Sequence, residues 1–261
     1  MEIFLEMFPL SVGAICKNES HCIREWIEHY LFHGVSHFYI IDDGSTDNTV
    51  SILREYESKG IVSLFCANWK YYLGRQRDMY NHYILPHVCE SEWLLMVDVD
   101  EFVWSPMDID LRNILKLCSN LSQIQFGTTL YGSNGHIQQP TSLVAGFTKR
   151  TFKQPTDKCY KYFINSKYKF TSLNIHHATF QDKNDENGKF LILNTDYFRL
   201  NHYRCQSREF WNTVKCTRGD GDAYCQRTPD DFEQLDCNEV EDLGLYEQNK
   251  PLLPLVGEKM L

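Results

Sequence analysis

The chain has 261 residues, of which 43% are hydrophobic and 23% charged, with 14 Gly and 8 Pro. This composition excludes a disordered or fibrous protein, and the length allows one large domain or two small ones. The 26 Lys and Arg residues against 35 Asp and Glu residues give a net charge of −9, which argues against broad electrostatic binding to nucleic acid or to an anionic membrane. The same acidic field favours a bound divalent cation.

No apolar run approaches the roughly 20 residues that a membrane-spanning helix needs, so no integral membrane segment is expected. Residues 1–6 are acidic where a signal peptide would be basic. The 10 cysteines form no Cys-x-x-Cys pair, which gives no support to a zinc ribbon or a thioredoxin-like site. We expect reduced thiols in a soluble, cytoplasmic protein, whereas paired cysteines would fit a lumenal domain cut from a longer protein.

The first hundred residues alternate between short apolar runs and stretches with apolar residues at helical spacing. The periodic stretches predict a helix that Ser20 caps and Gly34 ends, a second helix that Gly60 ends, and a third over 75–84. Repeated β-α-β units of this length predict a parallel sheet with helices on both faces and ligands at the carboxyl ends of its strands. The apolar runs predict those buried strands at 11–16, 37–41, 61–65 and 93–97.

Beyond Trp104 the regular alternation fades. A helix over 108–118 and a strand over 123–126 are expected to lead into a Gly-rich turn region at 127–135. Residues 150–205 are rich in Tyr, Phe, Lys, Asn and His, which indicates an irregular or antiparallel half that shapes a pocket.

Asp98 and Asp100 directly follow the apolar strand at 93–97. Residues two apart in an extended strand point to the same side, so both carboxylates can converge where the strand ends. Oxygen donors of this kind suit Mg²⁺ or Mn²⁺ and leave positions for phosphate oxygens, whose charge the metal would neutralise. The alternative is a pair of solvated loop carboxylates, but the preceding buried strand favours the metal site.

A second acidic cluster, at 42–47, follows the strand at 37–41. Taken alone, this segment is typical of a turn with a helix N-cap. It ends at the same sheet edge as Asp98, where a carboxylate such as Asp43 can accept hydrogen bonds from a ribose hydroxyl or a nucleobase N–H. The segment 14–19 ends the first strand and brings further polar groups to this edge.

Several motifs follow one another in a fixed order over roughly residues 11–218. In the first half they lie at 14–19, 25–30, 34–40, 43–47 and 93–102. In the second half they lie at 131–136, 161–164, 176–177 and 201–204. The combination resembles a GT-A-fold glycosyltransferase, and more narrowly family 92 of the glycosyltransferases and its family 2-like relatives. Several motifs in one order are far more specific than any one of them alone.

The resemblance implies an α/β chain with the GT-A (nucleotide-diphospho-sugar transferase) fold, whose mostly parallel central sheet is flanked by helices. It also implies a single catalytic domain over 1–261, with a nucleotide-sugar-binding half at 1–104 and a less regular acceptor-side half at 105–261. The implied reaction is a Mn²⁺- or Mg²⁺-dependent, inverting transfer of a sugar. The donor would be a nucleotide sugar, with UDP as the expected nucleotide, and the acceptor a hydroxyl of a glycan or glycoprotein.

Carried over by position, the resemblance implies that Asp98 and Asp100 hold the metal. His202 would provide a further contact to the metal or the diphosphate, because neutral imidazole is a competent Mn²⁺ ligand. Gln76 and Arg77 can touch the donor or lie on an exposed helix face. The donor-binding candidates are Asp43 at the nucleoside, Lys17 and Glu19 in the first loop, Asp98 and Val99, Gln76 and Arg77, and Lys161 and Arg204 at phosphate oxygens.

Inversion needs a general base that deprotonates the acceptor hydroxyl. We expect Asp220 or Asp222, because both lie in a glycine-containing loop able to approach a substrate closely. Asp157 and Asp182 lie in the same half of the chain and are alternatives. The adjacent residues His176 and His177 are expected to pack or cap within this half.

Two other functions compete with the transferase. A phosphohydrolase of the haloacid dehalogenase type also carries a D-x-D motif after an apolar strand, with the first Asp as nucleophile. That motif normally lies on the first strand, whereas three predicted strands precede Asp98 here. A catalytically inactive, sugar-binding GT-A domain would have nearly the same sequence. The family resemblance also includes animal members with an amino-terminal membrane anchor and stem, which we do not expect here because the chain begins almost at its first strand.

Overall fold

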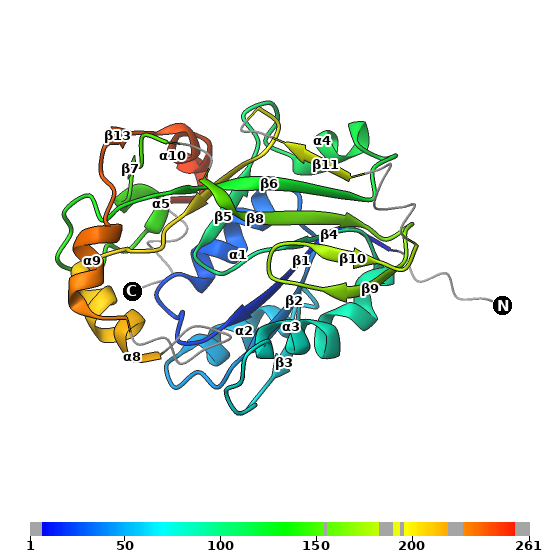
Figure 1. Ribbon diagram of the computed structural model, residues 1–261, viewed down its shortest axis with the longest axis horizontal. Coiled ribbons are helices and arrows are strands. Elements are labelled where there is room, and N and C mark those ends of the chain that lie inside the picture. The colour runs from blue at the N-terminus through cyan, green and yellow to red at the C-terminus, as the bar shows by residue number, and fades with distance from the viewer. Residues whose placement is uncertain (1–6, 154–155, 183–189, 194–195, 219–226, 254–261) are drawn as a thin grey trace.

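The computed structural model describes residues 7–153, 156–182, 190–193, 196–218 and 227–253 (Figure 1). One large sheet runs through these residues in the order β3-β2-β1-β4-β8-β6-β12-β5, and β11 pairs with β6. The strands are β1 (Phe8–Cys16), β2 (His37–Asp42), β3 (Val62–Cys66), β4 (Ser91–Met96), β5 (Glu101–Trp104), β6 (Gln123–Leu130), β8 (Thr156–Asn165), β11 (Phe190–Leu193) and β12 (Arg199–His202).

The sheet is mostly parallel. Strands β3, β2, β1 and β4 pair in parallel, as do β6 with β12 and with β11. Strand β8 lies between β4 and β6 and runs antiparallel to both, while β5 runs antiparallel to β12. The expected α/β fold class with a mostly parallel central sheet is therefore confirmed.

Helical segments cover both faces of this sheet. The α-helices of the first half are α1 (Ile23–Phe32), α2 (Thr49–Glu57), α3 (Arg75–Met79) and α4 (Leu111–Leu117). A π-helical turn, η1 (Tyr80–Ile84), and a 3₁₀ turn, η2 (Leu85–Glu90), continue α3 toward β4.

Alternation along each strand divides the core into two layers, because successive side chains point to opposite faces. On β2, Phe38 and Ile40 face the layer that contains Trp26 of α1 and Leu53 of α2. Tyr39 and Ile41 face the other layer. The other layer includes Met79 of α3, Tyr80 and Ile84 of η1, and Leu173 and Ala178 of the β9–β10 pair (Phe170–Leu173 and Ala178–Phe180).

The strand registers bring the carboxyl ends of the parallel strands together. Cys16 at the end of β1 pairs with Asp42, which in turn pairs with Cys66. On the other side of β1, Gly13 pairs with Met96, and the Gly13 carbonyl accepts a hydrogen bond from the Val97 N–H at 3.2 Å. The chain therefore leaves β1, β2 and β4 at one edge of the sheet, as the sequence predicted.

Two local expectations were wrong. Ser20 does not cap α1: its N–H donates to Asp47 instead, and the N-cap is Cys22, whose side chain makes no capping bond. The helix expected over 75–84 is found, as α3 followed directly by the π-helical turn η1. Strand β6 continues to Leu130 through the region expected to be a turn, with Gly127 paired to Tyr160 and a register shift after it. The expected helix ends at Gly34 and Gly60 hold, because both residues adopt positive φ (93° and 72°).

The second half contains short and partly antiparallel elements, as expected from its composition. Strand β13 pairs antiparallel with β7. In the described part of the chain, no helix is long and apolar enough to cross a membrane. The remaining elements are α5 (Leu143–Gly146), β7 (Lys149–Arg150), α7 (Arg208–Phe210), η3 (Trp211–Lys215), α8 (Cys216–Arg218), α9 (Pro229–Leu235), β13 (Val240–Glu241), α10 (Gly244–Asn249) and η4 (Lys250–Leu252).

Candidate active site

A cleft of about 350 Å³ lies where the chain leaves β1, β2 and β4. Its lining also takes residues from β12 and from the η3–α8 segment, which are distant in sequence. Of the residues that the sequence singled out, the cleft brings together Lys17, Glu19, Asp43, Gln76, Asp98, Val99, Asp100, His202 and Arg204.

Asp98 is held by a buried lysine. Its Oδ2 accepts a hydrogen bond from Lys161 Nζ at 2.7 Å, and Lys161 Nζ also lies 3.1 Å from Glu101 Oε2. Burial alone would lower the pKa of Lys161, but the carboxylates of Asp98 and Glu101 outweigh that effect and hold the pKa well above its usual value. Lys161 is therefore a fixed cation.

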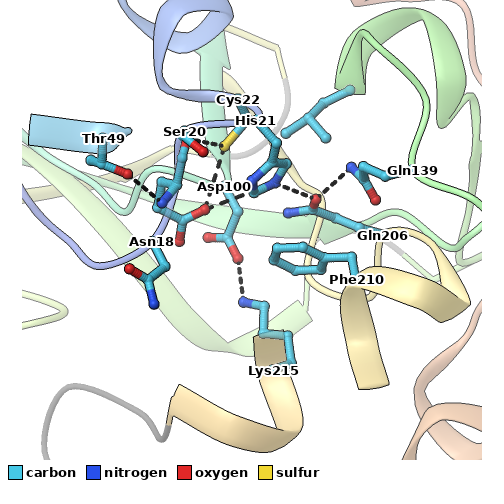
Figure 2. Close-up of polar contacts among 12 residues, drawn as sticks. Asn18, Ser20, His21, Cys22, Thr49, Asp100, Gln139, Gln206, Phe210 and Lys215 are labelled. Atoms are coloured by element: carbon cyan, nitrogen blue, oxygen red, sulfur yellow. Dashed lines mark hydrogen bonds and ion pairs between the residues drawn. The ribbon is translucent and has the colours of Figure 1, made fainter. Parts of the chain in front are cut away.

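Asp100 has a similar partner from the far end of the chain. Its Oδ2 accepts a hydrogen bond from Lys215 Nζ at 2.7 Å, as Figure 2 shows, and its Oδ1 lies 3.5 Å from His202 Nε2. Burial would raise the pKa of Asp100, but Lys215 and His202 hold it well below its usual value. Both carboxylates of the D-x-D motif are thus paired to lysines, which sequence reasoning did not predict.

Glu101 links these groups, although no motif in the sequence pointed to a separate role for it. It is the first residue of β5 and is 1% exposed. Its Oε2 accepts a hydrogen bond from the Asp98 N–H at 2.9 Å, and its Oε1 lies 3.6 Å from His202 Nδ1. The β5–β12 register pairs Glu101 with His202, so the sheet itself places the imidazole between Glu101 and Asp100.

The end of β2 forms another side of the cleft. Asp43 makes an ion pair with Arg75, which is 1% exposed and stacks 4.5 Å from the centre of the Tyr71 ring. Burial raises the pKa of Asp43 even though Arg75 opposes the shift. Gln76 also borders the cleft and donates to the Tyr80 hydroxyl at 2.7 Å. Arg75 was missed because its partner lies 32 residues away in the sequence.

The loop after β1 connects to the η3–α8 segment. Lys17 Nζ donates to the Tyr71 hydroxyl at 3.2 Å, and Glu19 makes an ion pair with Arg218. Arg218 Nη1 also donates to the Lys17 carbonyl at 2.6 Å. These contacts join the first loop of the domain to the part of the chain that carries Lys215.

Glu19, His21 and Cys22 bring three potential metal-ligand atoms within 4.8 Å of one another. Figure 2 shows His21 and Cys22 of this group. Each of them already has a partner, since Glu19 pairs with Arg218, His21 bonds to Gln206 and the Cys22 thiol donates to Glu19. Burial raises the pKa of Cys22 well above its usual value, which keeps the thiol protonated and makes it a poor metal ligand. This cluster is therefore better explained as loop structure.

The D-x-D residues fit a divalent cation. Asp98 Oδ1 is buried and has no hydrogen-bond partner among the described residues, while Asp98, Asp100 and His202 all line the cleft. Carboxylate oxygens and an imidazole nitrogen are suitable ligands for Mn²⁺, and carboxylate oxygens for Mg²⁺. The lysines occupy one oxygen of each carboxylate, so the free Asp98 oxygen is the observation that supports the fit.

The cleft is cationic relative to the rest of the chain. Among its described lining residues, five Lys and Arg side chains face four carboxylates, in a chain whose net charge is −9. Such a lining favours an anionic ligand of phosphate type. The five cationic residues are Lys17, Arg204, Lys215, Arg218 and Arg227.

Two of the predicted site residues, Arg77 and Lys161, are placed otherwise, and two more are not described. Arg77 does not line the cleft, because its side chain is half exposed and bonds to its neighbour Asp78. Lys161 lies behind Asp98 and is 2% exposed, so it supports a carboxylate rather than facing phosphate directly. Asp220 and Asp222 lie outside the described residues. Of the alternative bases, Asp182 does not line the cleft, and the side chain of Asp157 is not described.

A sequence model of glycosyltransferase family 92 matches residues 12–234. Similar curated proteins include a family 92 protein of Oryza sativa subsp. japonica, 23% identical over 212 residues, and one of Arabidopsis thaliana, 27% identical over 221 residues. Each match covers 79% of this chain but 34% and 36% of the respective relative. The chain therefore spans about a third of the length of these relatives.

Solved structures show a weaker likeness. TarS of S. aureus, in a structure with UDP, has a TM-score of 0.46 and 12% identity, covering 78% of this chain and 62% of that one. HddC of Yersinia pseudotuberculosis has a TM-score of 0.39 and 12% identity, covering 74% of this chain and 92% of that one.

Proposed function

The chain belongs to glycosyltransferase family 92, and from this premise we propose that it transfers a sugar from a nucleotide diphosphate donor to a hydroxyl of a glycan acceptor. The proposed donor is a UDP-sugar and the proposed stereochemical outcome is inversion. The observation that carries the proposal is the cleft at the carboxyl ends of β1, β2 and β4, where the D-x-D carboxylates and a cationic lining face the same space.

The geometry suggests how the donor would lie. Asp43 and the Tyr71 ring border the side where a nucleoside would bind, with Arg75 fixing the Asp43 carboxylate and stacking on Tyr71. Arg204, Lys215 and Arg218 supply positive charge for the diphosphate, which is the leaving group. Lys215 and Arg218 are preorganised by their ion pairs with Asp100 and Glu19, so little reorganisation of these two side chains is needed as charge develops.

Asp98, Asp100 and His202 would hold the divalent cation. When bound, Mn²⁺ or Mg²⁺ supplies Lewis-acid stabilisation of the negative charge on the departing diphosphate. Lys161 neutralises Asp98 Oδ2 from behind, which leaves Oδ1 as the oxygen available to a ligand. The base expected at Asp220 or Asp222 stays a prediction.

The test is a panel of UDP-sugars incubated with the purified protein and Mn²⁺, with release of free nucleoside diphosphate as the readout. We expect turnover of one donor and its loss on removal of the metal with EDTA. Asp100→Ala should lower kcat by about 10²–10³-fold, since it removes a carboxylate at the charge-stabilising centre. Arg77→Ala is the matched control, because Arg77 lies outside the cleft, and its activity should be unchanged.

Two results would contradict the proposal. One is wild-type turnover that Asp100→Ala leaves intact in a variant whose melting temperature shows that it is folded. The other is release of inorganic phosphate from phosphomonoesters without release of nucleoside diphosphate from any UDP-sugar, which is the signature of the phosphohydrolase.

A further inference from the structure

The carboxylates that line the described part of the cleft are poorly suited to act as a base. Each of the four makes an ion pair with a lysine or arginine: Glu19 with Arg218, Asp43 with Arg75, Asp98 with Lys161 and Asp100 with Lys215. A neighbouring cation stabilises the charged form of a carboxylate and so weakens it as a proton acceptor. At Asp43 burial outweighs this effect and raises the pKa, but the proposed donor geometry gives Asp43 to the nucleoside. The acceptor hydroxyl nevertheless needs a group that takes its proton.

His176 borders the same cleft, and unlike a carboxylate its side chain is uncharged in the form that accepts a proton. It lies in the connection between β9 and β10 and is half-buried. Its Nδ1 lies 2.9 Å from the backbone carbonyl oxygen of Tyr160 on β8. A carbonyl oxygen can only accept a hydrogen bond, so Nδ1 carries the proton and the neutral ring keeps its lone pair on Nε2.

The backbone around His176 is fixed from two sides. The His176 carbonyl accepts a hydrogen bond from Gln125 Nε2 on β6, and the Asn174 N–H donates to the His177 carbonyl at 2.8 Å. Tyr162 on β8 donates its hydroxyl proton to the Asn174 carbonyl. The imidazole is therefore held by the central sheet, which is the placement that a base needs.

We infer that His176 is the general base of the transfer, and this inference rests on the proposed glycosyltransferase function. The proton of the acceptor hydroxyl moves to His176 Nε2 while the acceptor oxygen forms a bond to the anomeric carbon. The bond from that carbon to the diphosphate oxygen breaks, and its electron pair leaves with the diphosphate. The Tyr160 carbonyl stabilises the resulting imidazolium through Nδ1–H, and the proton is later lost to water.

The electrostatic surroundings are compatible with this role. Burial lowers the pKa of His176, which keeps the ring neutral and able to accept a proton near neutral pH. The Tyr160 carbonyl and Asp98 favour the imidazolium, whereas Lys161 and His177 disfavour it.

The experiment compares His176→Gln with His177→Gln, a matched control because His177 is the exposed neighbour. UDP-hexoses are supplied with methyl glucoside, methyl galactoside and methyl N-acetylglucosaminide as acceptors. We expect His176→Gln to lower kcat by about 10²–10⁴-fold, to remove the acidic limb of the pH–rate profile, and to leave the Kd of UDP unchanged. His177→Gln should keep the wild-type kcat and an acidic limb in the pH–rate profile.

The inference would be overturned by a His176→Gln variant that keeps its kcat, or by Asp220→Asn or Asp222→Asn removing the acidic limb instead. A second readout does not depend on turnover: ¹⁵N NMR should show the Nδ1–H tautomer of His176 in the wild type, and an Nε2–H tautomer would also overturn it. If the wild type turns over no UDP-sugar but has the expected tautomer, the proposed function fails while the geometry on which His176 was chosen holds.

Discussion

At the scale of single residues, each carboxylate of the D-x-D motif is held by a lysine from a distant part of the chain. The D-x-D motif is local, because a buried strand followed by two acids two positions apart places both at the strand end. Lys161 lies 63 residues after Asp98, and Lys215 lies 115 residues after Asp100. These pairs form only because β8 and the η3–α8 segment return to the same edge of the sheet. No local sequence pattern predicts this long-range placement.

Glu101 likewise has contacts in the structure that its local sequence does not predict. In the sequence it is one more acid beside the motif, but in the structure it accepts the Asp98 N–H, contacts Lys161 and faces His202. A buried carboxylate with these contacts fixes both the orientation of Asp98 and the ring of His202. Glu101 is thus a positioning residue for the proposed metal ligands.

We expect Glu101→Gln to weaken Mn²⁺ binding by about 10–100-fold, the range typical of outer-shell partners of metal ligands. The amide still reaches the Asp98 N–H, but it no longer balances the charge of Lys161. The charge of Lys161 is then balanced by Asp98 alone, so the Asp98 carboxylate becomes a weaker ligand for Mn²⁺. Titration calorimetry with Mn²⁺ in the presence of UDP measures the effect, and Glu92→Gln on the exposed part of β4 is the control. Equal affinities for Glu101→Gln and the wild type would contradict this role.

At the scale of elements, the strands and helices of the first half could be predicted because their apolar periodicity is local. The antiparallel strand β8 could not be placed between β4 and β6, since its position depends on pairing with strands that precede it by tens of residues. The continuation of β6 past Gly127 was also missed. Glycine usually marks a turn, but here Gly127 lies within a strand, directly before a register shift in its pairing with β8.

Gly13 shows how tightly these elements pack. It lies in the middle of β1, and a Cβ atom there would lie 2.6 Å from Met96 Sδ and 3.2 Å from Ile84 Cγ2. Met96 is the last residue of β4, and Ile84 belongs to η1. Because Gly13 has no side chain, η1 and the Met96 side chain can lie close to β1 at this point. Met96 is directly followed by Val97 and by Asp98 of the D-x-D motif.

We expect Gly13→Ala to lower the free energy of unfolding by about 1–3 kcal/mol, because an added methyl group overpacks this contact. Urea denaturation measures the change. Met96→Ala removes the nearest clashing atom, so Gly13→Ala should cost less in that background than in the wild type. An equal cost in both backgrounds would show that Met96 is not the atom that resists the added methyl group.

At the scale of the whole molecule, α10 near the carboxyl-terminal end of the described chain contacts α1, the first helix. Asn249 is the last residue of α10. Its Oδ1 lies 3.0 Å from His33 Nε2, and its Nδ2 lies 3.0 Å from His29 Nδ1. His29 Nε2 donates to the Val103 carbonyl of β5. Both histidines and Asn249 are almost completely buried. The last helix is therefore joined through histidine rings to the first helix and to the strand that follows the D-x-D motif.

This arrangement makes the stability of the fold depend on pH. Burial lowers the pKa of His29 well below its ordinary value, with a further contribution from His33, and burial also lowers the pKa of His33. The unfolded chain consequently binds more protons than the folded chain below about pH 7.5, one unit above the pKa of free histidine, where its protonation begins. Above that pH both states are neutral at these positions, and the histidines add no pH dependence.

We expect the free energy of unfolding to fall between about pH 7.5 and pH 5.5, by up to about 1.4 kcal/mol per pH unit for each of the two histidines. His29→Gln removes one titrating group, so its stability should fall less steeply even if it is lower at every pH. His177→Gln, at an exposed position, should keep the wild-type slope. Urea denaturation at several pH values measures these slopes. Parallel profiles for His29→Gln and the wild type would mean that the buried link between α1 and α10 does not govern the acid sensitivity of the fold.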